Sequence, residues 1–345
     1  MKRCKQCVLP ETFAGIEFDV NGVCNFCRDH KKRYDIDWEQ KDEVFGSMLA
    51  EVRRIAMIKG VPYDVIVPFS GGKDSTFTLY TMVAKYGMKP LAVTFNHCFM
   101  TDVMMENHKK VLSQLGVAHI MYKPDWQLVK KLCAKSLRML GDFCFHCHAG
   151  VYSFPMQIAA KYRIPALIWG TSGFNLIKDD NLKRDRNFFE KFVLGGTKIE
   201  SMVGDGITLR DLQPFMYPSD EELKGILSIN QGAYTFWNPR KQSEIIKKEL
   251  GWKGRKVEGS YVDYDNVECS VIGIRDYIKF IRRGFGRSCQ LASLDIMNGV
   301  MTRQKALKII EKHDGKRPAS LDKFLDDIEM TEMEFMAVAK RHKVS

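Results

Sequence analysis

The chain has 345 residues, of which 45% are hydrophobic, and a net charge of +11. This length predicts about two domains with a large buried core. No run of about 18 apolar residues occurs, and the opening MKRCKQC lacks the apolar segment of a secretory signal, so we expect a cytoplasmic protein without a membrane span. The positive charge favours an anionic partner, such as nucleic acid, a nucleotide or an acidic small molecule.

Short apolar runs alternate with helical patterns in the first half of the chain. The expected strands are residues 63–69, 90–96, 117–123 and 164–170, and the expected helices are 35–60, 74–86, 102–115, 125–140 and 149–162. This alternation predicts an α/β fold, in which a parallel sheet has helices on both faces. The last third is expected to be mostly helical, with helices at 239–250, 270–284, 302–313, 319–328 and 331–342.

Residues 70–75 read Ser-Gly-Gly-Lys-Asp-Ser and lie between an expected strand and an expected helix. The two glycines permit backbone angles and close approaches that side chains forbid. Free N–H groups at the helix N-terminus, two serine hydroxyls and the charge of Lys73 favour phosphate binding, and Asp74 can hold Mg²⁺. The pattern is neither the Walker A motif nor G-x-G-x-x-G.

Residues 70–75 instead resemble the PP-loop, S-G-G-x-D-S, of the N-type ATP pyrophosphatases. The resemblance implies that the loop binds the pyrophosphate end of ATP and that the enzyme transfers AMP to a carbonyl or carboxyl oxygen. It implies catalytic roles for Lys73, Asp74 and Ser75. It further implies that ATP is bound by residues at strand ends, namely Pro68, Phe69, Ser70, Gly71, Gly72, Asp74, Ser75, Phe95, Asn96, Gly170 and Thr171.

Two C-x2-C pairs, CKQC at 4–7 and CNFC at 24–27, open the chain. Their spacing is typical of a structural zinc knuckle. Four thiolates would close a tetrahedral site and stabilise a segment too small for its own core. The predicted zinc ligands are Cys4, Cys7, Cys24 and Cys27.

A second cysteine motif, DFCFHCHAG, contains Cys144 and Cys147, and Cys269 is a candidate third ligand. PP-loop enzymes that thiolate tRNA resemble this layout, and they use three cysteines for an iron–sulfur cluster. A metal ion or cluster, a redox dithiol and simple packing near the ATP site therefore stay open as interpretations. The remaining cysteines lie among apolar residues and are expected to be buried: Cys98, Cys133 and Cys289.

The segment GIRDYIKFIRRGFGR, residues 273–287, has basic residues at helical spacing and a single acid. Arginine forks bind phosphate or carboxylate well, so we interpret the segment as an anion site rather than as a solvated helix face. Its basic residues are Arg275, Lys279, Arg282, Arg283 and Arg287.

Six stretches spread over residues 1–325 together resemble the N-acetyl sugar amidotransferases of bacterial surface-polysaccharide and flagellin-glycan synthesis. They are CKQCVLPETFAGIEFDVNGVCNFC, PFSGGKDST, FCFHCHAG, RKQSEIIKKELGW, GIRDYIKFIRRGFGR and DGKRPASLDKFL. The resemblance implies an ATP-dependent conversion of an acetamido group to an acetamidino group through an adenylylated imidate. The substrate would be an acidic nucleotide-linked acetamido sugar, bound by the basic residues of 273–287.

The same resemblance implies partners and cofactors. Ammonia would come from a separate glutaminase with a cyclase-like partner, both of which resemble the subunits of imidazole glycerol phosphate synthase. ATP, Mg²⁺ and Zn²⁺ would be required. We expect three regions, a zinc knuckle at 1–33, a PP-loop ATP pyrophosphatase domain at 34–235 and a helical C-terminal region at 236–345.

Two other functions are weighed against this one. A tRNA 2-thiolation enzyme accounts for the zinc knuckle, the PP-loop, the second cysteine motif and the charge, but not for residues 273–287 or for the closing DGKRPASLDKF. A non-catalytic ATP-binding scaffold for a glutaminase would not need an intact Ser-Gly-Gly-Lys-Asp-Ser sequence. We therefore do not expect nucleic acid or a membrane as a partner.

Overall fold

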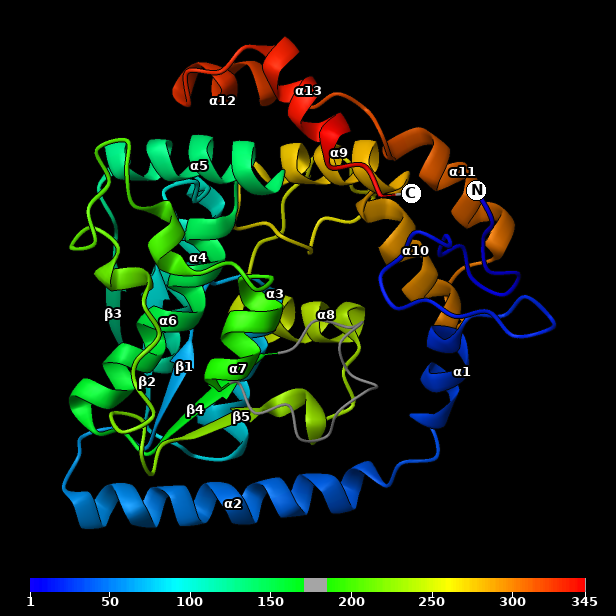
Figure 1. The fold of residues 1–345 in the computed structure, drawn as a ribbon. Helices are drawn as coiled ribbons and strands as arrows, with labels where there is room; N and C mark the ends of the chain where they lie inside the picture. The colour runs from blue at the N-terminus through cyan, green and yellow to red at the C-terminus, as the bar shows by residue number, and fades with distance from the viewer. Residues whose placement is uncertain (171–184, 345) are drawn as a thin grey trace.

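The computed structural model describes residues 1–170 and 185–344, and a parallel sheet lies at its centre (Figure 1). The five strands have the spatial order β3-β2-β1-β4-β5, and every neighbouring pair is parallel. They are β1 (Val65–Pro68), β2 (Pro90–Phe95), β3 (Ala118–Tyr122), β4 (Ala166–Trp169) and β5 (Leu227–Asn230). The α/β class and the four predicted strands are confirmed. The edge strand β5 was not predicted, because its sequence, LSIN, lacks a continuous apolar run.

Helices cover both faces of the sheet. Val65 and Val67 of β1 contribute to one hydrophobic cluster and Ile66 to another, because successive strand residues face opposite ways. The helices of the first face are α2 (Trp38–Lys59), α3 (Lys73–Tyr80), α4 (Asp102–Leu115) and α8 (Pro239–Leu250). The second face is covered by α5 (Trp126–Leu140) and α6 (Phe145–Tyr162). These helices confirm the predicted ones to within a few residues, as helix ends are expected to vary.

Shorter elements connect these parts. Helix α3 continues as a π-helical turn, Thr81–Lys85. The described chain between β4 and β5 contains α7 (Arg186–Phe188), a π-helical turn (Phe189–Val193) and two 3-10 turns (Ile199–Met202 and Gln213–Phe215), and a 3-10 turn (Gln231–Ala233) follows β5.

The C-terminal region forms a helical layer beyond one end of the sheet (Figure 1). Its helices are α9 (Ile272–Arg283), α10 (Arg287–Met297), α11 (Arg303–His313), α12 (Leu321–Asp327) and α13 (Glu332–Arg341). Residues of α9, α12 and α13 pack with α5 around Phe143 and Phe324. The helix predicted over 270–284 is confirmed as α9, which ends at Gly284, whose φ is +73°. Helix α10 was not predicted.

The two ends of the chain meet. In Figure 1 the N-terminal segment and α1 (Asn25–Lys32) lie beside α10 and α11. Val8 shares a hydrophobic cluster with Phe285 and Cys289. The Arg303 side chain of α11 donates to the carbonyl oxygen of Cys7 at 3.1 Å. The segment that carries the first cysteine pairs is thus docked on the C-terminal helices.

The three lone cysteines differ in burial. Cys133 and Cys289 are buried, as predicted. Cys98 is only partly buried, contrary to the prediction, because it lies in the loop after β2 with a φ of 68° rather than inside an apolar element.

The topology places the loop of residues 70–75 at a switch point of the sheet. From β1 the chain forms β2 and β3 on one side and then returns to form β4 on the other side of β1. Open α/β sheets bind ligands beyond the carboxyl ends of strands at such a point. Residues 70–75 follow β1, and Gly170 follows β4. Among the described residues, no helix combines the length and the apolar character that a membrane span requires.

Candidate active site

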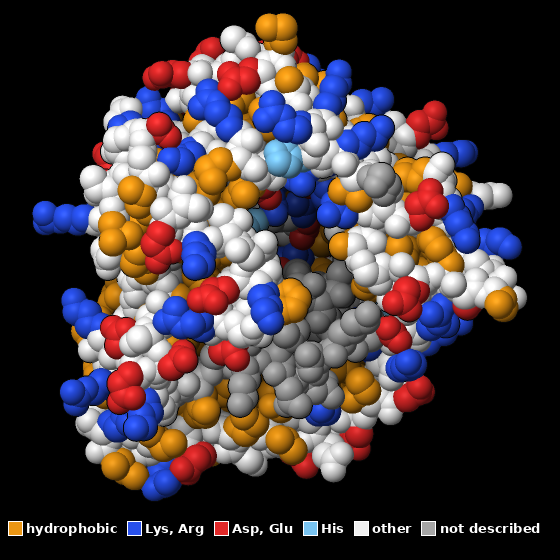
Figure 2. Space-filling view, in the orientation of Figure 1, with side chains coloured by type: hydrophobic (Ala, Val, Ile, Leu, Met, Phe, Trp, Pro, Cys, Tyr) orange, Lys and Arg blue, Asp and Glu red, His pale blue; other side chains and the backbone are white. Residues whose placement is uncertain are grey.

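A cavity of about 590 Å³ lies between residues 70–75, which resemble a PP-loop and are called the PP-loop here, and helices α9 and α10. Figure 2 shows a hollow near the centre of this face, where Lys and Arg side chains gather. The structure brings together two sets of predicted residues, because the same cavity is lined by Ser70, Gly72, Lys73, Asp74, Ser75, Arg275, Lys279, Arg282, Arg283 and Arg287.

The PP-loop is tightly packed on its side away from the cavity. Gly71 has a φ of +67°, and a Cβ atom there would lie 2.2 Å from Cε of Met104. The indole of Trp252 donates to the Gly71 carbonyl oxygen at 2.8 Å. The hydroxyls of Ser70 and Ser75 lie 3.1 Å apart. In the described part of the chain no side chain caps the start of α3, which leaves its first N–H groups available to an anion.

Lys73 is held between two carboxylates. Its Nζ lies 2.9 Å from Oδ2 of Asp74 and 2.7 Å from Oδ1 of Asp265, and its side chain is 5% exposed. Burial alone would lower the pKa of Lys73, but the charges of Asp265 and Asp74 outweigh it and raise the pKa. The lysine therefore stays charged. Trp237 donates to Oδ1 of Asp74 at 3.1 Å, which fixes the carboxylate at the cavity wall.

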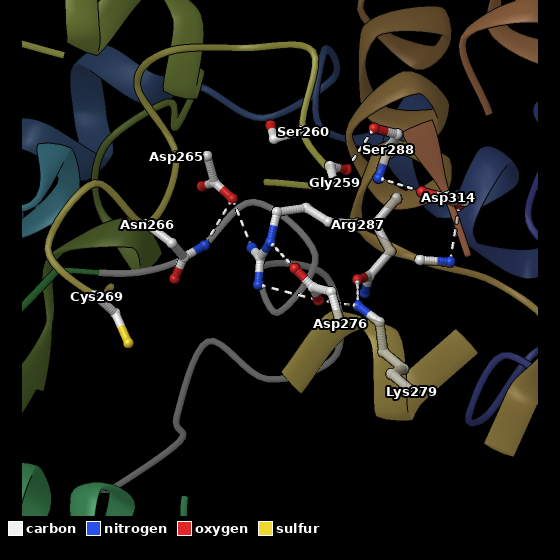
Figure 3. A network of polar contacts seen from close by, with 12 residues as sticks. Gly259, Ser260, Asp265, Asn266, Cys269, Asp276, Lys279, Arg287, Ser288 and Asp314 are labelled. Carbon is white, nitrogen blue, oxygen red and sulfur yellow. Dashed lines mark hydrogen bonds and ion pairs between the residues drawn. The ribbon is translucent and has the colours of Figure 1, made fainter. Parts of the chain in front are cut away.

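An ion-pair chain continues from Asp265 into the C-terminal helices (Figure 3). Arg287 Nη1 lies 2.6 Å from Oδ2 of Asp265, and Arg287 Nε lies 2.6 Å from Oδ2 of Asp276. Lys279 Nζ lies 2.9 Å from Oδ1 of Asp276. Burial would raise the pKa of Asp265, but Lys73 and Arg287 together lower it well below its usual range. Two of the five predicted basic residues are thus neutralised by internal acids.

The other basic residues are compensated weakly or not at all. Arg275 lies 3.4 Å from a carboxylate oxygen of Asp142. Arg282 donates to the Gly141 carbonyl oxygen at 3.0 Å, and Arg283 donates to that of Thr12 at 3.0 Å. Neither Arg282 nor Arg283 forms an ion pair with any described carboxylate. Their charges remain available to an anion in the cavity.

The carboxylates beside the PP-loop fit a magnesium ion. The Oε2 atom of Glu268 is buried without a hydrogen-bond partner among the described residues. A Cβ atom on Gly72 would lie 2.9 Å from that oxygen, so the acid faces the loop. Burial raises the pKa of Glu268 and that of Asp74. Mg²⁺ prefers carboxylate and phosphate oxygens, and Asp74 and Glu268 would hold it together with the phosphates of ATP.

The aromatic residues predicted to bind ATP lie in the core. The side chains of Phe69 and Phe95 are 1% and 4% exposed and belong to the clusters on opposite faces of the sheet. Asn96 uses its side-chain oxygen to accept from the Cys98 N–H at 2.9 Å. Pro68 is the last residue of β1 and does not line the cavity. A contact between ATP and the two phenylalanines would therefore involve their backbone.

Gly170, the residue after β4, lies close to the backbone of the PP-loop. A Cβ atom there would lie 3.0 Å from the backbone of Asp74 and 2.9 Å from the hydroxyl oxygen of Thr78. This close approach accounts for glycine at the position. Thr171, the other predicted contact after β4, lies outside the described residues.

The four N-terminal cysteines are gathered at one point. Their sulfur atoms all lie within 4.8 Å of one another, and all four residues are buried. The distances between Cys4 and Cys27 and between Cys7 and Cys24 are 3.9 Å and 3.7 Å. Four sulfurs about 2.3 Å from a tetrahedral zinc ion lie about 3.8 Å apart. The donor set and its spacing therefore fit a closed, structural metal site.

The second cysteine motif is arranged differently. Cys144, Cys147 and Cys269 lie in or against one hydrophobic cluster. Within residues 1–170 and 185–344, the four N-terminal cysteines form the one group of three or more His, Cys, Asp or Glu side chains whose ligand atoms all lie within 4.8 Å of one another. Burial raises the pKa of Cys269 to about 12 and also raises those of Cys144 and Cys147 above their usual value. A metal ion or cluster, a redox dithiol and simple packing all stay open as interpretations of this motif.

Several residues of the cavity were not found from the sequence. Asp265 and Glu268 precede the basic segment in VDYDNVEC, and this run of acids was the available signal for charge compensation. Asp142 lines the cavity, and Trp237 is buried behind it and donates to Asp74; both come from other parts of the chain, and no local pattern indicates them. Phe13 lines the cavity from the N-terminal segment, where the sequence suggested only metal ligands.

A comparison with protein families identifies the helical side of this cavity. Residues 258–345 match the family described as "LPS biosynthesis protein WbpG-like, C-terminal domain". The match includes α9 and α10 and thus all five predicted basic residues. Residues 258–345 are thus similar to the C-terminal domain of this family, which supports the resemblance to proteins of surface-polysaccharide synthesis over these residues.

Other similar proteins are more distant. The chain is 20% identical over 311 residues to the uncharacterized protein MJ1599 of Methanocaldococcus jannaschii, which covers 90% of this chain and 93% of that protein. NMN synthetase from Francisella tularensis is 12% identical with a TM-score of 0.39, over 80% of this chain and 92% of that one. The U34-tRNA thiolase NcsA from Methanococcus maripaludis with its 4Fe–4S cluster is 14% identical with a TM-score of 0.33. The similarity covers 90% of this chain and 89% of the thiolase chain.

Proposed function

We propose that this chain, with its WbpG-like C-terminal domain, is an ATP-dependent amidotransferase that converts an acetamido group of an acidic nucleotide-linked sugar to an acetamidino group. The observation that carries the proposal is that one cavity is lined by the PP-loop and by the basic residues of α9 and α10. A shared cavity lets the α-phosphorus of ATP and an anionic acceptor meet at reacting distance.

The chemistry proceeds in two steps. The acetamido oxygen attacks the α-phosphorus of ATP, and the bond to the leaving pyrophosphate breaks. The resulting O-adenylyl imidate is attacked at carbon by ammonia. AMP then leaves with the former amide oxygen, and loss of a proton gives the amidine. Adenylylation is needed because an amide carbonyl is a poor electrophile and its oxygen a poor leaving group.

The residues at the loop end serve the first step. Lys73 and the N–H groups at the start of α3 stabilise the charge that develops on pyrophosphate. Ser70 and Ser75, whose hydroxyls contact each other, shape the loop around it. Bound Mg²⁺, held by Asp74 and Glu268, would neutralise further phosphate charge.

The residues at the helical end position the acceptor. Arg282 and Arg283, together with Arg275, bind its carboxylate and phosphate groups, because planar guanidinium groups match both anions. Ammonia comes from a separate glutaminase and its cyclase-like partner, since the sequence contains no convincing glutaminase nucleophile.

The test is conversion of a defined acceptor. The purified protein is incubated with a UDP-linked diacetamido uronic acid, ATP, Mg²⁺ and ammonium, and the sugar is analysed by mass spectrometry. Replacement of one oxygen by NH on an acetamido group, with equimolar AMP and pyrophosphate, is the expected result. Pyrophosphate release that depends on added tRNA would overturn the proposal in favour of tRNA thiolation. ATP binding without pyrophosphate release from ATP, whichever such acceptor is added, would indicate a scaffold.

A further inference from the structure

We infer that the N-terminal segment held by the four cysteines is a wall of the acceptor site, in which Phe13 and Arg283 bind the nucleotide part of the acceptor. This inference deepens the proposed function and rests on it. Phe13 offers an aromatic side chain, and Arg283 offers a guanidinium group without a carboxylate partner among the described residues. A flat base next to a phosphate is the ligand chemistry that such a pair recognises.

Thr12 joins the N-terminal segment to the end of α9. The guanidinium of Arg283 donates to the Thr12 carbonyl oxygen at 3.0 Å, and the Thr12 hydroxyl donates to the Arg283 carbonyl oxygen at 2.5 Å. This reciprocal pair sets the direction of the Arg283 side chain. Because the carbonyl is neutral, the bond orients the guanidinium without cancelling its charge.

Phe13 is held from two sides. Its ring lies 5.1 Å from that of Phe26, edge to face, and 5.5 Å from that of Phe285. Phe26 lies between the two cysteines of the second pair, and Phe285 lies in the turn between α9 and α10. The position of the Phe13 ring therefore depends both on the cysteine cluster and on the helices of the cavity.

The cysteine cluster is the main interior of this segment. Its buried hydrophobic residues are the four cysteines and Leu9. The backbone nitrogen of Cys4 donates to the carbonyl oxygen of Leu9 at 2.9 Å, and Cys24 N–H donates to Cys4 Sγ at 3.2 Å. A metal bound by the four thiolates would supply much of the free energy that orders residues 8–23 on the C-terminal helices. Metal loss would release Thr12 and Phe13 from the cavity while leaving the PP-loop in place.

Binding of nucleotides tests the aromatic contact. Affinities for UDP, GDP and CMP are measured singly by calorimetry, with the PP-loop first saturated by α,β-methylene-ATP and Mg²⁺. Phe13→Ala is expected to lower the affinity for the tightest-binding of these nucleotides roughly tenfold or more, whereas Phe13→Tyr is expected to keep the wild-type affinity. The matched control is Phe18→Ala, since Phe18 also packs on the cysteine cluster but does not line the cavity; it should bind as wild type does.

The metal is tested in the same assay. Zinc is removed by a chelator or by Cys24→Ser, and metal content, circular dichroism and affinity for the ATP analogue are recorded. Retained ATP affinity with a tenfold or greater loss of nucleotide affinity is expected.

The inference is overturned if Phe13→Ala binds as wild type, if Phe18→Ala loses as much, if wild type binds none of the three nucleotides, or if zinc-free protein keeps full affinity. Sugar conversion is measured separately, so an intact amidotransferase with an unimportant Phe13 would be recognised.

Discussion

The two ends of the cavity contain similar cations in different electrostatic settings. At the loop end, Lys73 and Arg287 lie within 2.7 Å of the same carboxylate, that of Asp265. At the outer end, Arg282 and Arg283 donate to backbone carbonyl oxygens. A count of basic residues therefore does not locate an anion site. Partner carboxylates decide which charges hold the protein together and which are left for a ligand.

The largest effect is expected at the loop end, on catalysis. Asp74→Ala removes a carboxylate that pairs with Lys73 and that would hold Mg²⁺. We expect pyrophosphate release to fall to background while circular dichroism shows a folded protein. Undiminished release would refute the role of Asp74. Asp263→Ala is the matched control, because Asp263 is exposed, pairs with Lys247 and does not line the cavity.

The next effect concerns stability. Asp265→Asn leaves Lys73 and Arg287 buried without their shared carboxylate, and such a broken pair costs about 3–5 kcal/mol of unfolding free energy. Urea unfolding at pH 7 measures this loss. A loss no larger than that of Asp263→Asn would contradict the view that the loop-end cations are structurally compensated.

The same variant gives a pH dependence with a definite sign. The folded-state pKa of Asp265 is lowered, so its stabilisation is fully present above its unfolded-state pKa of about 4. It is lost as the pH falls towards the folded-state value. The gap in unfolding free energy between wild type and Asp265→Asn should therefore be constant from about pH 7 to 5 and should narrow below about pH 4. A gap that widens on acidification would have the wrong sign.

A smaller effect, on binding, is expected at the outer end. The double variant Arg282→Gln and Arg283→Gln removes two uncompensated charges, each able to form charge-assisted hydrogen bonds. We expect the KM for the nucleotide sugar to rise roughly 10- to 100-fold and the KM for ATP to change less than about twofold. An equal rise in KM for both substrates would contradict the distinction between the two ends of the cavity. Arg210→Gln, at an exposed site away from the cavity, is the control.

The smallest effect is expected on the surface. Arg317 pairs with Asp322 and Glu332, but all three side chains are substantially exposed to water. Solvent screening leaves such pairs little net energy. Arg317→Ala should therefore unfold at nearly the same urea concentration as wild type. A loss comparable to that of Asp265→Asn would show that burial does not decide the worth of these ion pairs.

The sequence predicted what depends on local pattern. Strands β1, β2 and β4 are buried and mostly apolar, β3 is a mostly apolar run that is only partly buried, and the two cysteine pairs have diagnostic spacing, so these features were visible. The edge strand β5 was missed because its four residues mix apolar and polar types. The cavity acids were missed because Lys73 and Asp265 are 192 residues apart, and only the tertiary fold joins them. Phe95 was expected at the ATP site, but its ring is needed in the core.

The most direct test of the account follows the amide oxygen. An acceptor labelled with oxygen-18 in its acetamido carbonyl is incubated with the enzyme, ATP, Mg²⁺ and ammonium, and the AMP is analysed by mass spectrometry. We expect the label to appear in AMP in proportion to the amidine formed. Amidine formation with unlabelled AMP, or AMP formation without amidine, would contradict transfer of the adenylyl group to the acetamido oxygen.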